Sequence, residues 1–149
     1  MFDDLRDLYQ EVILDHGRRP RHGARLAAFD ASAKGDNPMC GDRVQVFVRH
    51  DGGRIGEVGF EARGCAISIA SADLMAEVAA GCSDAEIHDL AQRFRELARS
   101  GAAAGDDAAI ERLRPLAGVH EFPSRVKCAT LPWHALLAAL DGKGEASSE

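Results

Sequence analysis

The sequence lacks a long, uninterrupted apolar run. Its most apolar stretch, residues 66–80, is interrupted by Ser68, Ser71, Asp73 and Glu77, whereas a membrane-spanning helix needs about 20 predominantly apolar residues. The opening residues are acidic and contain no apolar core of a signal peptide. We therefore expect a cytoplasmic protein with neither a membrane span nor a secretory leader.

The sequence also has fewer basic than acidic residues. The chain has 18 lysines and arginines against 24 acidic residues, which gives a formal net charge of −6. Nonspecific nucleic-acid binding requires a basic face that neutralises phosphates, so the composition argues against this function class. A local basic stretch at residues 17–22 could present charge to a protein partner instead.

Two common metal-site patterns are missing. No C-x-x-C pair occurs, so a zinc ribbon or knuckle is not indicated. No H-E-x-x-H or related motif occurs, which argues against a hydrolytic zinc enzyme. The six histidines match no ligand spacing either. The chain does contain four cysteines, and in a reducing compartment we expect thiols or metal ligands rather than disulfides.

The length of 149 residues fits one domain with a real core. We expect this domain to span residues 1–141 and a disordered polar tail to follow at 142–149. Apolar residues at helical spacing predict helices over 4–16, 66–80, 83–99, 107–113 and 126–140. Ser83 and Glu86 form a capping-box pattern, and Pro132 predicts a kink or a restart in the last helix.

Alternating apolar and polar residues predict strands. The clear ones are 43–50 and 56–63, joined by an Asp-Gly-Gly hairpin turn at 51–53. A less regular first strand is expected at 25–33, followed by turn formers at 34–38. Each clear strand has one apolar and one polar face, which suits an antiparallel sheet covered on one side.

Three of the four cysteines lie where elements begin or end. Cys40 lies in a loop that leads into a strand, Cys65 where a strand becomes a helix, and Cys128 at the start of the last helical segment. Such positions point toward a shared edge of the sheet, so the three side chains can meet. With one carboxylate they would complete a tetrahedral zinc shell. The spacing alone does not distinguish this site from cysteines buried as small hydrophobic residues.

The residues around these cysteines resemble the IscU/NifU-type family. The matching segments are Asn37-Pro-x-Cys-Gly-Asp42, Gly64-Cys-x-Ile-Ser68 with Ala70-Ser71, and Pro123-x-Arg-x-Lys-Cys-Ala129. They occur in the family order, and the resemblance extends from about residue 8 to residue 137. It is greatest to the SufU branch: Lys127 stands where IscU-type chains have a histidine, and residues 100–119 resemble an insert of that branch.

The resemblance implies an α+β fold, with a three-stranded antiparallel sheet backed by helices and a metal site at one end of the sheet. It implies Cys40, Asp42, Cys65 and Cys128 as the metal ligands. In the SufU branch this site holds Zn²⁺ and accepts persulfide sulfur from a SufS-type cysteine desulfurase. We therefore expect a zinc-dependent sulfurtransferase, in the sense of a stoichiometric persulfide acceptor. Its partners would be this desulfurase and downstream cluster-assembly proteins, with no nucleic acid and no membrane.

Two residues are expected to carry the chemistry. Cys40 is the expected sulfur acceptor, because its loop contains Pro38 and Gly41 and should be the most exposed of the three. Three thiolates and a carboxylate around Zn²⁺ leave excess negative charge, which nearby cations must offset. Arg125 is the preferred cation, because its guanidinium donates in a fixed fork.

Two alternatives remain open. The same four ligands could hold a [2Fe–2S] cluster that is assembled and passed on, since thiolates suit iron and zinc alike. Alternatively, a closed zinc site could be purely structural in a partner-binding protein. Cys82, outside the family segments, is interpreted as an incidental thiol, and His16 as a partner contact on the opening segment.

Overall fold

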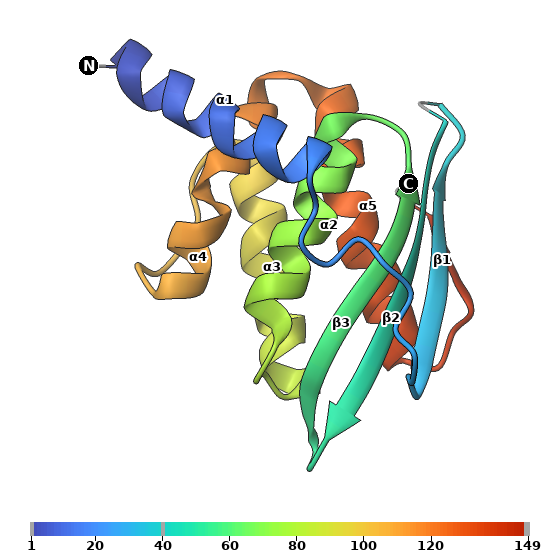
Figure 1. Ribbon diagram of the computed structural model, residues 1–149. Helices are drawn as coiled ribbons and strands as arrows, with labels where there is room; N and C mark the ends of the chain where they lie inside the picture. The colour runs from blue at the N-terminus through green and yellow to red at the C-terminus, as the bar shows by residue number, and fades with distance from the viewer. Residues whose placement is uncertain (1, 40, 148–149) are drawn as a thin grey trace.

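The computed structural model describes residues 2–39 and 41–147 of the chain. The first helix is followed by three consecutive strands, then by a run of helices, and a short strand comes last (Figure 1). The elements are α1 (Phe2–Arg18), β1 (Ala31–Asn37), β2 (Asp42–Asp51), β3 (Arg54–Arg63), α2 (Ala66–Ala79), α3 (Asp84–Ser100), α4 (Ala108–Leu113), the 3₁₀ helix η1 (Arg114–Glu121), α5 (Pro123–Leu140) and β4 (Glu145–Ser147).

The sheet has the strand order β3-β2-β1-β4. Strands β1, β2 and β3 are antiparallel, and Val46 lies opposite Phe60 with both side chains buried. The hairpin turn between β2 and β3 uses Gly52 and Gly53, whose φ angles of 62° and 81° favour glycine. The predicted three-stranded antiparallel sheet is confirmed, with a short fourth strand added.

The position of β1 differs from the prediction. The strand spans Ala31–Asn37 rather than 25–33, so residues 34–37, which were expected to form a turn, are part of the sheet. Gly35 permits this arrangement, because a Cβ there would lie 3.1 Å from the side chain of Leu131 on α5. Tertiary pairing with β2 and close packing of α5 thus override the local turn preference.

The C-terminal segment also differs from the prediction. Residues 145–147, within the tail expected to be disordered, form β4 and pair in parallel with β1. The backbone N–H of Lys34 donates to the carbonyl of Gly144 at 2.9 Å. Strand β1 would otherwise expose unpaired backbone groups at the sheet edge, and β4 satisfies part of that edge.

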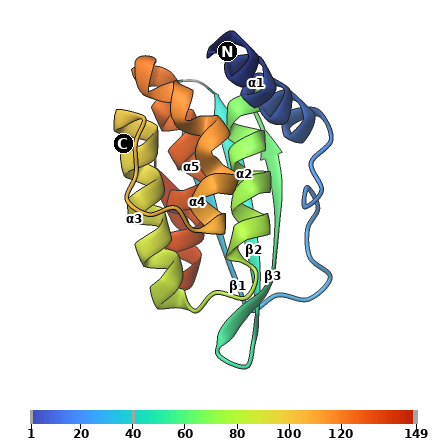
Figure 2. The ribbon, with the colours of Figure 1, turned by 90° about the vertical axis from the view of Figure 1, so that its left-hand side faces the viewer.

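The helices lie on one side of the sheet, where α2 and α5 cover the inner face of the strands and α3 and α4 stand beside them (Figure 2). Phe94 of α3 stacks on Trp133 of α5 with ring centroids 4.8 Å apart. Ser83 and Glu86 form the predicted capping box at the start of α3. Helix α5 begins earlier than predicted and runs through Pro132 without a restart. No helix in the described residues is long and apolar enough to cross a bilayer.

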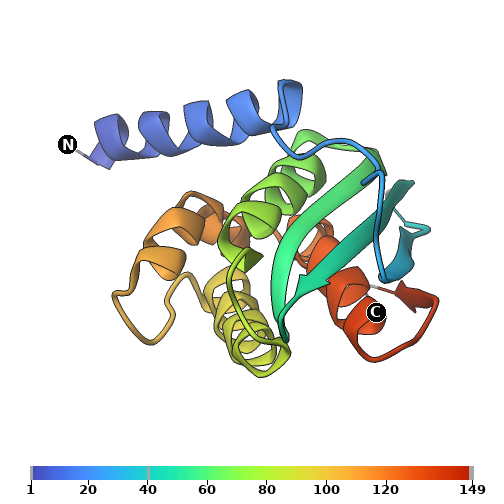
Figure 3. The ribbon, with the colours of Figure 1, turned by 60° about the horizontal axis from the view of Figure 1, so that its bottom comes forward.

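Helix α1 lies along the outside of α2, and the segment after it crosses the other face of the sheet (Figure 3). The close approach is made at Gly59, where a Cβ would lie 2.4 Å from the carbonyl oxygen of Ala24. Phe47 is fully buried under this segment, with its ring 5.0 Å from that of Phe29. The end of the sheet that adjoins the start of α2 is left for the site described next.

Candidate metal centre

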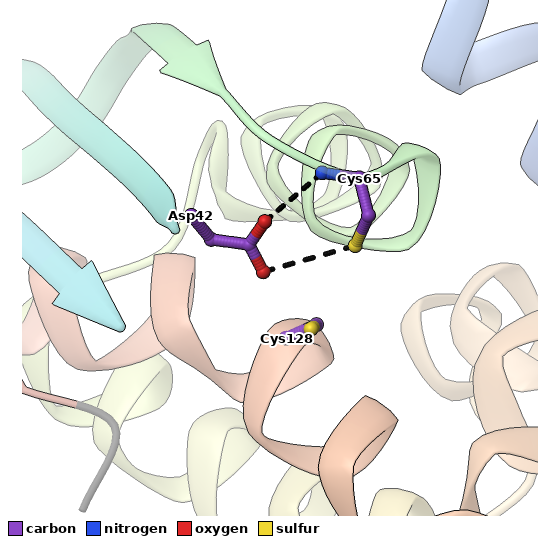
Figure 4. Close-up of side chains that lie close together, drawn as sticks. All are labelled: Asp42, Cys65 and Cys128. Atoms are coloured by element: carbon purple, nitrogen blue, oxygen red, sulfur yellow. Dashed lines mark hydrogen bonds between the residues drawn. The ribbon is translucent and has the colours of Figure 1, made fainter. Parts of the chain in front are cut away.

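Three side chains from distant parts of the sequence converge at one end of the sheet. Asp42 begins β2, Cys65 is the N-cap residue of α2, and Cys128 lies in the second turn of α5. One ligand atom from each lies within 4.8 Å of the others (Figure 4). Asp42 and Cys128 are fully buried. The predicted convergence of these three residues is present in the structure.

Asp42 is held in place by Cys65. Its Oδ1 accepts the backbone N–H of Cys65 at 2.9 Å, and its Oδ2 accepts a weak hydrogen bond from the Cys65 thiol at 3.7 Å (Figure 4). A buried carboxylate requires such partners, because its desolvation is otherwise costly. Asp42 is therefore built into the cluster and is more than a turn residue at the start of a strand.

Gly64 makes room for this arrangement. Its φ of 142° lies in a region that favours glycine, and a Cβ there would lie 2.1 Å from Oδ1 of Asp42. The glycine before Cys65 is thus a steric requirement of the carboxylate position. The Gly-Cys pair in the sequence has a direct structural cause.

The electrostatic surroundings favour negative charge on the cluster. Cys65 lies at the N-terminus of α2, where unpaired N–H groups and the helix dipole attract anions. The exposed Arg125 guanidinium has a pKa above its ordinary value. The largest cause is the charge of the Cys65 sulfur, and the second is a hydrogen bond with Cys128. Arg125 therefore lies beside both cysteine sulfurs.

The two other cations near the ligands in sequence have different surroundings. Arg43 lies on the outer face of β2, where its Nε is 3.5 Å from Asp36, and its side chain is 75% exposed. Lys127 is also exposed. Of these three cations, Arg125 is the one that lies beside the cysteine sulfurs, and its role there stays a prediction.

Cys40, the expected fourth ligand and sulfur acceptor, lies outside the described residues. The neighbouring Met39 is 81% exposed. The N–H of Gly41 donates to the carbonyl of Asn37 at 2.9 Å, which closes a tight loop between β1 and β2. The loop thus begins and ends beside Asp42. The assignment of Cys40 as the fourth ligand and as the sulfur acceptor stays a prediction.

Cys82 takes no part in the cluster. It lies beyond the opposite end of α2, half-buried, and its thiol donates to the carbonyl of Val78 at 3.5 Å. Burial raises the pKa of this thiol, which makes it less reactive.

His16 is a buried residue and offers little surface to a partner, since only 4% of it is exposed. Its Nδ1 contacts the buried carboxylate of Asp73, and its Nε2 lies 3.2 Å from Nη2 of Arg112. Because arginine only donates, Nε2 is the acceptor and Nδ1 carries the proton given to Asp73. Asp73 also accepts the backbone N–H of His22 at 2.8 Å. Sequence reasoning missed this pair, although a lone aspartate in an apolar helix was a signal for it.

Residues 8–139 match the family model described as NifU-like N terminal domain. The chain belongs to the NifU-like N-terminal domain family. This match covers most of the chain and includes all the segments on which the predicted family resemblance was based.

Relatives of two kinds match this NifU-like chain over most of its length. The iron–sulfur cluster assembly scaffold protein IscU of Streptococcus pyogenes serotype M1 is 37% identical over 136 residues, covering 91% of this chain and 84% of the relative. The zinc-dependent sulfurtransferase SufU of Bacillus subtilis (strain 168) is 35% identical over 133 residues, covering 89% of each. The two identities are similar, so they support the family rather than one branch.

A solved structure agrees with the fold of this NifU-like domain. It is that of a putative iron–sulfur cluster assembly scaffold protein for the SUF system (FiSufU) from Fervidobacterium islandicum AW-1. The TM-score is 0.79 at 30% identity, with 87% of this chain and 94% of the other covered.

Proposed function

We propose that the protein acts in iron–sulfur cluster assembly as a zinc-dependent sulfur carrier, which accepts persulfide sulfur from a SufS-type cysteine desulfurase. The observation that carries this proposal is the cluster of Asp42, Cys65 and Cys128, with Arg125 beside its sulfurs. The names of the family relatives, a sulfurtransferase and a scaffold, point to the same process.

The donor set fits zinc. Two thiols and a carboxylate are ligands that Zn²⁺ accepts, and a Zn–S distance of about 2.3 Å places the sulfurs of a tetrahedral site about 3.8 Å apart. Ligand atoms that already lie within 4.8 Å of one another need only a small closing movement. Cys40 would add the fourth ligand from the loop after β1. Bound zinc keeps cysteine sulfurs as thiolates near neutral pH.

The residues at the site have different roles in this proposal. The Cys65 N–H orients the Asp42 carboxylate, and Arg125 offsets the negative charge of the sulfurs. Cys40 is the acceptor: its thiolate attacks the terminal sulfur of the desulfurase persulfide. The new S–S bond forms on Cys40 as the old one breaks, and the desulfurase cysteine leaves as a thiolate.

The decisive experiment measures alanine released from cysteine by a SufS-type desulfurase, without iron, in the presence and absence of the zinc-loaded protein. We expect a large increase that the Cys40→Ala variant abolishes. A matched control is Cys82→Ala, because Cys82 lies outside the cluster and should leave the increase intact. No increase without iron would reject the proposal.

A second candidate is a scaffold on which a [2Fe–2S] cluster is assembled, as the name of the streptococcal relative indicates for that protein. Thiolates suit iron and zinc alike. This function would need iron for any stimulation of the desulfurase and would give the visible absorption of a cluster. A purely structural zinc, the further alternative, would be needed for folding and would resist exchange.

A further inference from the structure

Two buried donors without partners flank the metal centre. Among the described residues, three buried side-chain nitrogen or oxygen atoms have no hydrogen-bond partner: Nδ2 of Asn37, Oγ of Ser68 and Nε1 of Trp133. Buried polar groups are nearly always paired, because leaving them unpaired is costly. Asn37 and Ser68 are each 1% exposed, so solvent at the protein surface does not reach them.

Asn37 is paired with Asp42 in the sheet. It is the last residue of β1 and lies directly opposite Asp42 in the antiparallel ladder. Both residues are buried and face the helices. Residues directly opposite each other have Cβ atoms about 5 Å apart, within reach of an amide group. The unpaired N–H₂ of Asn37 is thus within reach of a ligand of the cluster.

Ser68 lies in the interface between α2 and α5. It follows the N-cap residue Cys65 by three positions, so the two share a side of the helix. One turn further along, the Ser71 hydroxyl donates to the carbonyl of Ala129 at 2.5 Å. This face of α2 therefore packs against α5 at the residue after Cys128. The unpaired hydroxyl of Ser68 lies on the same face, one turn closer to the cluster.

We propose that Asn37 and Ser68 are positioning residues whose N–H and O–H groups donate hydrogen bonds to the ligand atoms of the metal centre when a metal is bound. This inference rests on the proposed function for the presence of the metal. Neutral thiols are weak acceptors, whereas thiolates and carboxylates accept charge-assisted hydrogen bonds. The unpaired donors thus gain partners when a metal draws the ligand atoms together and turns the thiols into metal-bound thiolates. They would orient the ligands and reduce the negative charge at the site.

The test compares zinc affinity with the stability of the metal-free protein. In Ser68→Ala the zinc dissociation constant, measured by chelator competition, should rise about 10- to 100-fold. The midpoint temperature of unfolding of the metal-free variant should stay unchanged or rise, because an unpaired buried hydroxyl is removed. Ser68→Thr keeps the hydroxyl and should restore zinc affinity. The matched control is Ser71→Ala, whose hydroxyl has a partner; it should lower the metal-free midpoint and leave zinc affinity unchanged.

A spectroscopic signature provides the second readout. In the Co²⁺-substituted protein, loss of a hydrogen bond to sulfur should move the thiolate-to-cobalt charge-transfer band to longer wavelength in Ser68→Ala. Asn37→Leu should weaken zinc binding in the same way. If this variant does not fold without metal, the Ser68→Ala and Ser68→Thr pair decides. Unchanged zinc affinity with a lower metal-free midpoint in Ser68→Ala would overturn the inference.

These measurements need no desulfurase, so the two proposals can fail separately. If the variants bind zinc more weakly but the native protein accepts no sulfur, the proposed function alone is rejected. Sulfur transfer with zinc affinity independent of Asn37 and Ser68 would reject the positioning role alone.

Discussion

The buried Asp42 carboxylate accepts the backbone N–H of Cys65 at 2.9 Å, across 23 residues of sequence. This contact links the start of β2 to the start of α2 and holds two candidate metal ligands together without a metal. A metal ion would therefore bind to a site that is already largely formed, which reduces the conformational entropy lost on binding.

Substitution of Gly64 by alanine should disrupt this contact. The new Cβ would lie 2.1 Å from Oδ1 of Asp42, and the φ of 142° is strained for any other residue. We expect at least about tenfold weaker zinc binding and a loss of about 1–3 kcal/mol in the free energy of unfolding. Chelator competition and denaturant titration measure the two effects. The control is Gly81→Ala, where φ is 88° but no atom lies within 4 Å of the Cβ. This variant should be less stable but should bind zinc as tightly as the native protein. Equal zinc affinity in both variants would contradict the steric argument.

Replacing Arg125 by glutamine should slow sulfur transfer, because it removes the cation beside the Cys65 and Cys128 sulfurs. We expect a decrease of about tenfold or more in the rate of persulfide acceptance, measured as alanine release at saturating desulfurase. Arg43→Gln is the control, since Arg43 lies on the outer face of β2 beside Asp36. A similar decrease in both variants would mean that general surface charge, rather than contact with the sulfurs, is responsible.

The pair of His16 and Asp73 should contribute strongly to stability. Both side chains are buried, and Asp73→Ala would leave His16 Nδ1 and the His22 N–H without an acceptor. Leaving a buried hydrogen-bond donor without an acceptor costs about 1–3 kcal/mol, which urea unfolding would detect. The exposed Asp89, paired with Arg93 at 3.2 Å, provides the comparison: Asp89→Ala should have little effect. A small change in Asp73→Ala would show that α1 is not anchored through this pair.

Stability should depend on pH through His50. Its Nδ1 lies 2.5 Å from Asp30 and its Nε2 lies 2.9 Å from Asp84, so both ring nitrogens face carboxylates. The hydrogen bond with Asp30, then that with Asp84, raises the pKa of His50 above its ordinary value of 6.5. The folded state thus holds the proton more tightly than the unfolded state. This stabilisation is fully present below about pH 6.5 and is lost as the pH rises through the raised pKa.

The measurement is the free energy of unfolding between pH 5 and 9 for the native protein and for His50→Gln. The difference between the two should shrink as the pH rises. His88→Gln, which affects an exposed histidine 3.3 Å from Asp141, is the control and should leave the profile of the native protein intact. A constant difference for His50→Gln across the range would contradict the role of the two carboxylates.

Much of the fold was predictable because its causes are local. The β2–β3 hairpin follows from alternating apolar residues and from glycines that accept positive φ at the turn. The start of α3 follows from the Ser83 and Glu86 capping box, whose partners are three residues apart. The Cys-Gly-Asp, Gly-Cys and Lys-Cys-Ala segments indicated where Asp42, Cys65 and Cys128 would be found.

Other features depend on segments that meet only in the folded chain. Strand β1 extends through turn-forming residues because β2 and α5 pack against it. Strand β4 exists because β1 has a free edge. His16 and Asp73 are 57 positions apart, and the unpaired donors of Asn37 and Ser68 are recognisable only from their burial. The sequence by itself thus determined the local elements and the ligand types, because these depend on near neighbours. The tertiary structure decided the strand edges, the buried contact between His16 and Asp73 and the hydrogen-bond partners of the site, because these depend on which distant residues are brought into contact.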